Sequence, residues 1–405
     1  MPGINRRRFM QCAAAGIGSI PALSTFAAGD AAKPPNLVFL FADQLGRNHC
    51  EYAGDAKAET PNMDRIAREG VDFVNAVSTM PVCSAFRASL LTGRYPTSTG
   101  MIINELRMNP NQRCLGHVLT DAGYDTGYIG KWHLYANQLG NHLDPHNSFV
   151  PPGKDRLGFD GYWAAYNFHH EYYRGYYHTD SEEKISYGKN VYEPDGQADL
   201  ALEFLRNARK GQRPFALFVS FGTPHDPWFA GNAPQEYLDR FKDVPFSNPP
   251  NYSPENDPYA DTWGCFKEGE REQLEAWRRI YYAMAANLDW NIGRILECIE
   301  DSGERDNTLV VFTSDHGEMF GAHGRRNKNI FYEEAARVPF LMRLPGAIPA
   351  GSRSEACLGT VDILPTVLGL LGAPIPSEVE GMDLSAAAQG KPCTEPEAAL
   401  LQNTG

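Results

Sequence analysis

The sequence predicts an α/β protein with a large, mixed but mostly parallel sheet that is sandwiched by helices. After residue 33, short apolar runs alternate with stretches of helical character. Such alternation is typical of a sheet covered on both faces. A second observation supports this fold class, because four of the apolar runs end in Asp, His or Lys. Sites of open α/β sheets gather beyond the carboxyl ends of the strands.

These four runs are predicted to be strands, and each delivers polar side chains to one edge of the sheet. They are "NLVFLFADQ" (36–44), "YDTGYIGKWH" (124–133), "PFALFVSFGTPHDP" (214–227) and "NTLVVFTSDHGE" (307–318). One such ending carries little information, since turns after strands are usually polar. Four endings in ligand-type residues are hard to explain by loop composition and indicate a functional site.

Residues 1–30 are predicted to be a twin-arginine-type signal peptide rather than part of the fold. The basic stretch "NRRRFMQ" at 5–11 precedes an apolar stretch rich in Ala and Gly, as in exported proteins. That stretch is too short to span a membrane, so no stable membrane anchor is expected. We therefore predict export by the twin-arginine machinery to a periplasmic or secreted location. Such cargo folds before export, so any modification would be installed in the cytoplasm.

Composition excludes some partners. The 405 residues are 42% hydrophobic and 21% charged, with a formal net charge of −13. This is an ordinary globular composition, and without a basic tail it argues against nucleic acid and anionic membranes as partners. The eight cysteines show no metal-type spacing. Most are expected to be buried thiols, while one or two disulfides stay open.

The stretch "PVCSAFRASLLTGRYP" at 81–96 places one cysteine at the head of a predicted helix. Arg87 follows one turn after Cys83, and the apolar run of the helix stops at Thr92-Gly93. A structural cysteine could lie anywhere in a chain. Cys83 stands where a reactive group would, because a helix N-terminus favours negative charge.

Two of the strand ends carry an oxygen-rich set of side chains. Asp43 and Gln44 end one strand, and Asp315 and His316 end another. Each aspartate alone could equally be a helix N-cap. Together they predict a divalent-cation site, since oxygen ligands suit Ca²⁺ or Mg²⁺ and the histidine nitrogen leaves Mn²⁺ or Zn²⁺ open.

Basic side chains complete the candidate site. They are Arg87, Lys131, His133, His225 and Lys328. Ordinary surface charge is the alternative interpretation, but "GKWH" and "TPHDP" lie in turns confined by Gly, Pro and Trp. A metal with such a set describes a pocket for a tetrahedral anion that is held by its charged oxygens.

On these motifs the chain resembles the type I sulfatases of the alkaline-phosphatase superfamily. The matching segments run in family order over about 35–373 and include "PNLVFLFADQLG", "TMPVCSAFRASLLTGRYP", "GYIGKWHL", "GTPHDPW" and "TSDHGEMFGAHGRRNKNIFYEEAARVPFLMRLPG". The resemblance implies an alkaline-phosphatase-like fold and a catalytic domain over 34–375. It also implies hydrolysis of sulfuric esters.

The resemblance further implies a role for each candidate residue. Cys83 matches the cysteine that a maturase oxidises to formylglycine, and Arg87 matches the arginine that steadies it. The metal ligands would be Asp43, Gln44, Asp315, His316 and residue 83, with Ca²⁺ favoured and Mn²⁺ or Mg²⁺ as alternatives. Lys131 and Lys328 match sulfate-binding lysines. His133 matches the histidine beside the formylglycine, and His225 the one that faces the leaving oxygen.

Three positions depart from the commonest family pattern. Gln44 stands where many members have a second aspartate, which weakens the prediction of the metal. Ala85 replaces the usual proline of the motif, which leaves the maturase open. Residues 376–405 are predicted to be the start of a truncated C-terminal region, in which the usual antiparallel subdomain is missing.

Several hypotheses on function stay open at this stage. A sulfatase acting on sulfated carbohydrates or a sulfated small molecule is favoured. The alternatives are a phosphonate monoester or phosphate diester hydrolase, a choline-sulfatase-like enzyme, and an inactive sulfatase-like binding protein. The aromatic segment 159–178 is equally a packed loop or a substrate-lining one. The Pro-rich segment 245–264 has no evident catalytic group.

Overall fold

An eight-stranded sheet forms the centre of the protein. The computed structural model describes residues 33–136, 147–208 and 211–403, so the predicted signal peptide lies outside the described residues. The strand order is β10-β2-β9-β8-β1-β7-β3-β4, and only β9 runs antiparallel to its neighbours. The strands are β1 (Asn36–Asp43), β2 (Val71–Val77), β3 (Asp125–Lys131), β4 (Tyr162–Tyr166), β7 (Phe215–Pro224), β8 (Thr308–Ser314), β9 (Phe340–Arg343) and β10 (Ser352–Gly359). A separate pair is formed by β5 (Tyr176–Tyr177) and β6 (Ile185–Ser186). The predicted mixed, mostly parallel sheet is confirmed.

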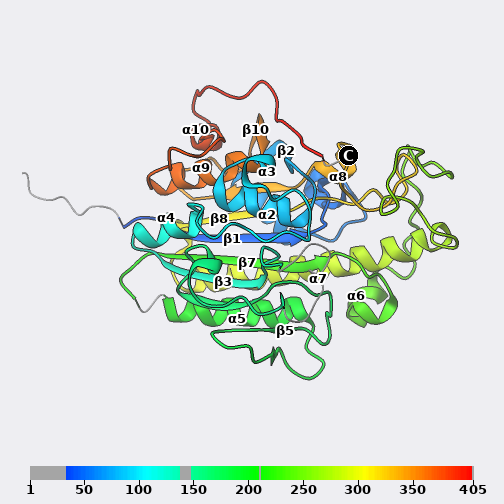
Figure 1. Cartoon of the computed structure of the whole chain (residues 1–405), viewed down its shortest axis with the longest axis horizontal. Helices are drawn as coiled ribbons and strands as arrows, with labels where there is room; N and C mark the ends of the chain where they lie inside the picture. The colour runs from blue at the N-terminus through cyan, green and yellow to red at the C-terminus, as the bar shows by residue number, and fades with distance from the viewer. Residues whose placement is uncertain (1–32, 137–146, 209–210, 404–405) are drawn as a thin grey trace, which may run out of the picture. The chain divides into compact units, whose positions relative to one another are not determined.

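Helices cover both faces of this sheet (Figure 1). One layer contains α2 (Cys83–Thr92), α4 (Leu115–Asp121), α9 (Thr360–Leu371) and α10 (Ser385–Ala388). The other contains α1 (Pro61–Glu69), α5 (Glu193–Ala208), α6 (Gln235–Arg240) and the long α7 (Leu274–Asp301). The short helices α3 (Pro96–Thr99) and α8 (Glu333–Ala336) lie in connections.

Strand β1 shows why the sheet is buried on both sides. Leu37, Phe39 and Phe41 belong to one hydrophobic core cluster, whereas the alternating Val38 and Leu40 belong to the other. Successive side chains of a strand point to opposite faces, so a continuous apolar run fills two cores at once. The predicted strand positions agree with β1, β3, β7 and β8.

Helix α2 starts and ends as the sequence predicts. It begins at Cys83 and is buried along its whole length. It ends at Thr92 because Gly93 adopts a left-handed conformation (φ 63°) and donates its N–H to the Ser89 carbonyl at 2.8 Å, an arrangement typical of helix C-termini. Val82 before the helix is extended, so Cys83 is its first residue.

The region after 375 packs on the same unit as the sheet. The Met382 N–H donates to Asp362 at 2.7 Å, and the Gln402 N–H donates to the Thr79 carbonyl at 2.7 Å. Among the described residues of this region there is α10 but no strand. The seven described cysteines are free thiols, so no disulfide forms in this part of the chain.

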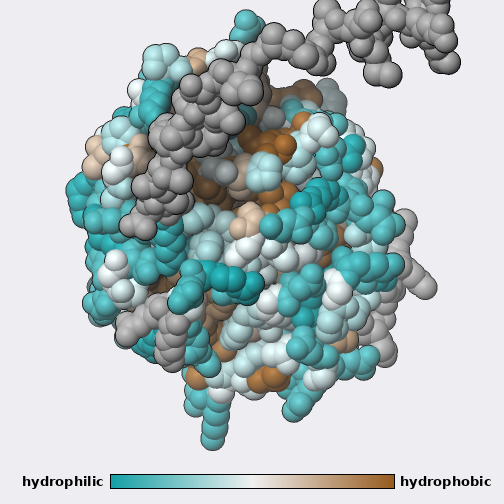
Figure 2. Space-filling model, turned by 90° about the vertical axis from the view of Figure 1, so that its left-hand side faces the viewer, coloured by the Kyte–Doolittle hydropathy of each residue, from teal (hydrophilic) through white to brown (hydrophobic). Residues whose placement is uncertain are grey.

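The face of the protein in Figure 2 is mostly hydrophilic, and its hydrophobic residues gather mainly in a hollow. None of the helices within the described ranges has the length and apolar character needed to cross a bilayer.

Candidate active site

Sheet order brings the predicted site residues together at one edge. Strand β1 lies between β7 and β8, and β3 lies on the other side of β7. The register pairs Ala42 with Ser314 and Asp43 with Pro224. Parallel strands end at the same edge, so residues 271 or more positions apart meet there, as the hydrogen bond from the Gln44 N–H to Asp315 Oδ1 (3.0 Å) shows.

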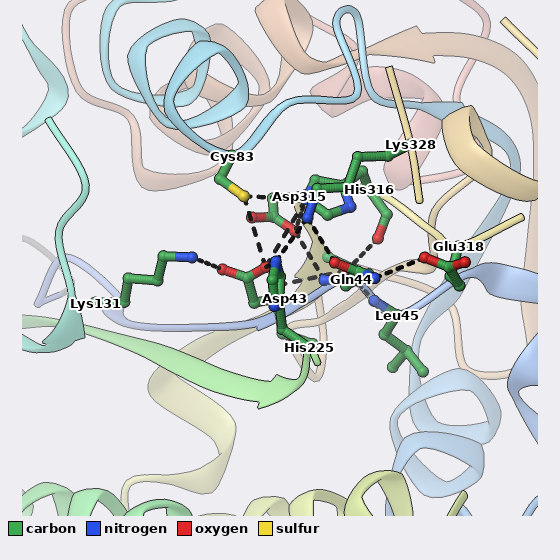
Figure 3. A network of polar contacts seen from close by, with 12 residues as sticks. Asp43, Gln44, Leu45, Cys83, Lys131, His225, Asp315, His316, Glu318 and Lys328 are labelled. Atoms are coloured by element: carbon green, nitrogen blue, oxygen red, sulfur yellow. Dashed lines mark hydrogen bonds and ion pairs between the residues drawn. The ribbon is translucent and has the colours of Figure 1, made fainter. Parts of the chain in front are cut away.

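Four potential ligands converge at this edge (Figure 3). The ligand atoms of Asp43, Cys83, Asp315 and His316 all lie within 4.8 Å of one another and are buried. Cys83 Sγ is 3.2 Å from His316 Nε2 and 3.7 Å from Asp43 Oδ1. The structure thus brings the N-terminus of α2 onto the two strand ends, as the sequence predicts.

The surroundings shift the pKa values of the two aspartates of this cluster in opposite directions. Burial alone would raise the pKa of Asp43, but Lys131, His225, Arg87 and His316 together hold it well below its ordinary value. Burial and then the charge of Asp43 raise the pKa of Asp315 to about 7. Two buried carboxylates this close repel each other unless a cation lies between them. The donor set therefore fits a divalent metal.

The histidine and the amide of the set are oriented for ligation. His316 Nδ1 is 3.0 Å from the Gly317 carbonyl, to which it donates its proton, so the lone pair of Nε2 faces the cluster. Gln44 donates its amide N–H to Glu318 at 2.7 Å. This contact turns the Gln44 Oε1 into the site, where Lys328 donates to it at 2.5 Å.

Arg87 is buried beside the cluster and bridges its two aspartates. Its guanidinium donates to Asp43 at 3.1 Å and to Asp315 at 3.4 Å. It also donates to the Lys131 carbonyl and to Ser220 Oγ, both at 2.7 Å. Arg87 thus ties α2, β1, β3, β7 and β8 together and neutralises part of the acidic charge.

The end of β3 places two further basic groups. Lys131 Nζ donates to Asp43 Oδ2 at 2.6 Å, and His133 is buried with its ring packed on Phe168 at 4.4 Å between centroids. The ring centroid of Phe168 also lies 4.8 Å from Lys131 Nζ. The aromatic segment 159–178 therefore both fills the core and lines the candidate site.

The end of β7 and the loop after β8 supply a second basic pair. Lys328 Nζ donates to His225 Nε2 at 2.6 Å, and His225 Nδ1 donates to the Asp226 carbonyl at 2.8 Å. Burial and then the charge of Lys328 hold the pKa of His225 well below its ordinary value. Trp263 lies above Lys328, with its ring centroid 5.3 Å from Nζ.

Known proteins match this chain in sequence and in fold. The Sulfatase family model matches residues 35–373. This chain belongs to the sulfatase family. It is 38% identical over 373 residues to the ulvan-active sulfatase of Formosa agariphila, covering 91% of this chain and 68% of that relative. It is 30% identical to an N-acetylglucosamine-6-O-sulfatase of Bacteroides thetaiotaomicron, with 89% and 72% covered.

Solved structures agree with this family and fold. A structure titled as that of the sulfatase YidJ of Bacteroides fragilis superposes with a TM-score of 0.79 at 32% identity, covering 90% of this chain and 80% of that one. A protein solved with its substrate D-glucosamine-2-N,6-O-disulfate gives a TM-score of 0.75 at 28% identity, with 90% and 82% covered. A phosphonate monoester hydrolase of Agrobacterium radiobacter shares the fold, with a TM-score of 0.64 at 24% identity over 90% of this chain and 78% of that one. The alkaline-phosphatase-like fold is confirmed, and the chain is a sulfatase.

Sequence reasoning missed several groups at this sulfatase's site. Glu318 orients Gln44, although it stands only two residues after His316. His170 and Phe168 were hidden in a segment whose aromatic density suits packing equally well. Trp263 comes from the Pro-rich segment 245–264, which gave no sign of contact with Lys328. No sequence signal links that segment to the site, because its position depends on contacts with the loop after β8.

Proposed function

We propose that this sulfatase hydrolyses sulfate monoesters of carbohydrates, using a divalent metal and a formylglycine made from Cys83. The observation that carries the proposal is the buried cluster in which Cys83, at the N-terminus of α2, faces Asp43, Asp315 and His316. Similarity to sulfatases whose names refer to ulvan and to N-acetylglucosamine 6-O-sulfate supports a glycan substrate.

The metal would be held by Asp43, Gln44, Asp315, His316 and residue 83. Carboxylate and amide oxygens form most of this set, which suits Ca²⁺, Mg²⁺ or Mn²⁺, and the resemblance to the sulfatases favours Ca²⁺ among them. A bound cation would polarise a sulfate oxygen and neutralise charge in the transition state. The hydrogen bonds from Gln44 to Glu318 and from His316 to the Gly317 carbonyl hold two of these ligands in orientation.

At residue 83 the aldehyde hydrate would supply two hydroxyls on one carbon, one to attack sulfur and one to lose its proton when sulfate leaves. His133 is assigned to accept that second proton. Lys131 and Lys328 would bind the sulfate oxygens as positive charges. Arg87 would hold the acidic ligands in place through its contacts with Asp43 and Asp315.

His225 and Lys328 would together protonate the departing sugar oxygen. Their contact of 2.6 Å gives His225 Nε2 a direct proton donor in the ammonium group. His225 is buried apart from 8% of its surface, so the leaving oxygen would meet this pair in a largely dry pocket. General acid assistance of this kind contributes about 10²- to 10⁴-fold to rate.

A substrate panel tests the proposed function. Protein with residue 83 converted should release sulfate from sulfated glycans and sugars faster than from choline sulfate or aryl sulfates, while Cys83→Ala serves as the blank. Phosphonate monoesters belong on the panel because a phosphonate monoester hydrolase shares the fold, and phosphate diesters are included as the other alternative substrate class. Faster turnover of phosphonates than of any sulfate would replace the sulfatase reaction by that alternative. Tight binding of sulfated sugars without turnover would indicate an inactive binding protein.

We further propose export through the twin-arginine route, after oxidation of Cys83 by a maturase in the cytoplasm. The support is the basic stretch around Arg6 and Arg7 before an apolar run. Replacing both arginines by lysine should leave unprocessed protein in the cytoplasm. Unchanged appearance of that variant in the periplasm would contradict this route.

A further inference from the structure

Two histidines from different loops lie face to face at the candidate site. The rings of His170 and His225 have centroids 4.0 Å apart and planes inclined by only 7°. His170 comes from the loop after β4, and His225 follows β7 directly. Flat rings at this separation are in contact over their faces. One face of the His225 imidazole is therefore covered by His170.

Tyr172 fixes the ring of His170 to the end of β7. Its buried hydroxyl lies 3.3 Å from His170 Nδ1, 2.8 Å from the His225 carbonyl and 2.7 Å from the Gly222 carbonyl. Because a hydroxyl has one proton, it donates to a carbonyl and is free to accept the Nδ1–H of His170. The same side chain thus anchors His170 and the peptide group of His225.

The two hydrogen bonds of His225 act in the plane of its ring. Nδ1 contacts the Asp226 carbonyl at 2.8 Å, and Nε2 contacts Lys328 Nζ at 2.6 Å. Neither hydrogen bond prevents the ring from tilting out of its plane. The stacked ring of His170 does oppose such a tilt, because it covers one face of the His225 ring. Phe168 in turn packs edge-on against His170, with centroids 4.9 Å apart at 85°. His170 is thus held between Phe168 and His225.

We propose that His170 is a positioning residue that keeps the imidazole of His225 aimed at the leaving oxygen. The proposal rests on the proposed function, in which His225 and Lys328 protonate that oxygen. His170 acts on His225 through the face of its ring, and its Nδ1 serves only to anchor that ring on Tyr172, so a flat ring without nitrogens should keep most of the effect. A misaligned proton donor slows departure of a poor leaving group, but it hardly affects a good one.

The test compares His170→Ala with His170→Phe on two substrates. One substrate is the sugar sulfate that the wild type hydrolyses fastest, and the other is 4-nitrophenyl sulfate, whose leaving group needs little protonation. We expect His170→Ala to lower kcat on the sugar sulfate by about 10- to 100-fold, as small misplacements do, and on the aryl sulfate by less than about 3-fold. His170→Phe should restore most of the loss, and KM should change little in either variant.

A matched control comes from a second stacked histidine of this chain. His323 lies against Tyr332 with centroids 3.9 Å apart and planes 13° apart, and no contact with His225 is involved. His323→Ala should keep the wild-type ratio of the two activities. Equal losses on both substrates in His170→Ala, or a Phe variant as slow as the Ala variant, would overturn the proposal.

Crystal structures of the two variants separate this proposal from the proposed function. The His225 ring should tilt away from its wild-type plane in His170→Ala and keep that plane in His170→Phe. If the ring responds in this way while no sulfate ester is hydrolysed by the wild type, the positioning role stands and the assigned reaction is wrong. An unmoved ring in His170→Ala would reject the positioning role whatever the reaction.

Discussion

The site has two walls that are built in different ways. The metal wall consists of Asp43, Asp315, His316 and Cys83, which lie at two strand ends and the start of a helix. The leaving-group wall consists of His170, His225, Lys328 and Trp263, which follow three strands or, for Trp263, lie in a long connection between α6 and α7. The sheet fixes the first wall directly, whereas the second depends on loops that pack on each other. The metal wall therefore should carry the nucleophile and the cation, whereas the leaving-group wall should supply the proton donor and, at Trp263, a contact with the substrate.

Removing the nucleophile from the metal wall should have the largest effect. Cys83→Ala should lower turnover of any sulfate ester by about 10⁴-fold or more, since no covalent step remains. The wild-type peptide that contains Ser84 and Arg87 should be lighter than its cysteine form by mass spectrometry. Because Ala85 replaces proline, conversion is expected to be incomplete in a host without a suitable maturase.

Activity should then follow the converted fraction rather than total protein across preparations. A preparation whose residue 83 is wholly cysteine and which works at the full rate would contradict the mechanism. Cys83→Ala should still bind a sulfated sugar, because the lysines and His225 stay in place.

Removing one carboxylate from the same wall should have the next largest effect. Asp315→Ala should lose the metal and about 10³-fold in activity, equivalent to several kcal/mol of transition-state stabilisation. The fold should persist, because burial and Asp43 raise the pKa of Asp315 to about 7 and Arg87 keeps Asp43, Ser220 and the Lys131 carbonyl as partners. Elemental analysis measures the metal.

Asp257→Asn is the control for metal binding, because Asp257 pairs with Arg325 outside the cluster. It should retain full metal content. Full metal content in Asp315→Ala as well would remove Asp315 from the ligand set.

Within the leaving-group wall, the partly exposed Trp263 should affect substrate affinity rather than chemistry. Trp263 is 40% exposed beside Lys328, so a sugar bound through its sulfate would meet the indole face. Trp263→Ala should raise KM for sugar sulfates by about 10-fold, or about 1.4 kcal/mol, with kcat nearly unchanged. Tyr259→Ala, at a 91% exposed position of the same connection, should leave KM as it is. A similar rise in both variants would argue against a sugar contact at Trp263.

Buried Glu193, which lies next to the segment that carries His170, should make the stability of the protein depend on pH. Buried Glu193 accepts a hydrogen bond from Tyr166 at 2.7 Å and lies 3.6 Å from His169 Nδ1. Burial raises the pKa of Glu193 to about 8 and lowers that of His169 to about 3. Both side chains are then neutral in the folded protein near pH 6, and the 3.6 Å separation agrees with a neutral pair better than with a close ion pair.

The sign of the effect follows from these values. Above its ordinary pKa, Glu193 is ionised in the unfolded chain but stays protonated in the folded one until about pH 8. The free energy of unfolding should therefore fall as pH rises from about 5 to 8, by at most about 1.4 kcal/mol for each unit of pKa shift. Glu193→Gln should flatten this decline in denaturant titrations, whereas the exposed Glu378→Gln should not. Parallel pH profiles for wild type and Glu193→Gln would show that Glu193 is already ionised in the fold.

Much of the metal wall can be predicted from the sequence, because its signals are local. The apolar runs that end in Asp43-Gln44 and Asp315-His316 predict two buried strands. They also predict that these polar side chains lie at the carboxyl ends of the strands. A Pro-Val entry precedes the start of α2 at Cys83, and Gly93 marks its end. Only half of the leaving-group wall can be predicted from the sequence. His225 and Lys328 belong to recognisable motifs. The sequence around His170 and Trp263 contains no motif that would place these two residues at the site.

The sequence by itself determines the fold class, the strand ends and the residues that the sulfatase motifs carry. Apolar periodicity and helix stops act over a few residues, and so they can be read without knowing where the rest of the chain goes. Only the tertiary structure decides that His170 stacks on His225, that Glu318 turns the Gln44 amide, and that Trp263 lies over Lys328. The two ring contacts join side chains 55 or more positions apart, and all three depend on how loops fold against strand ends, which no local pattern specifies.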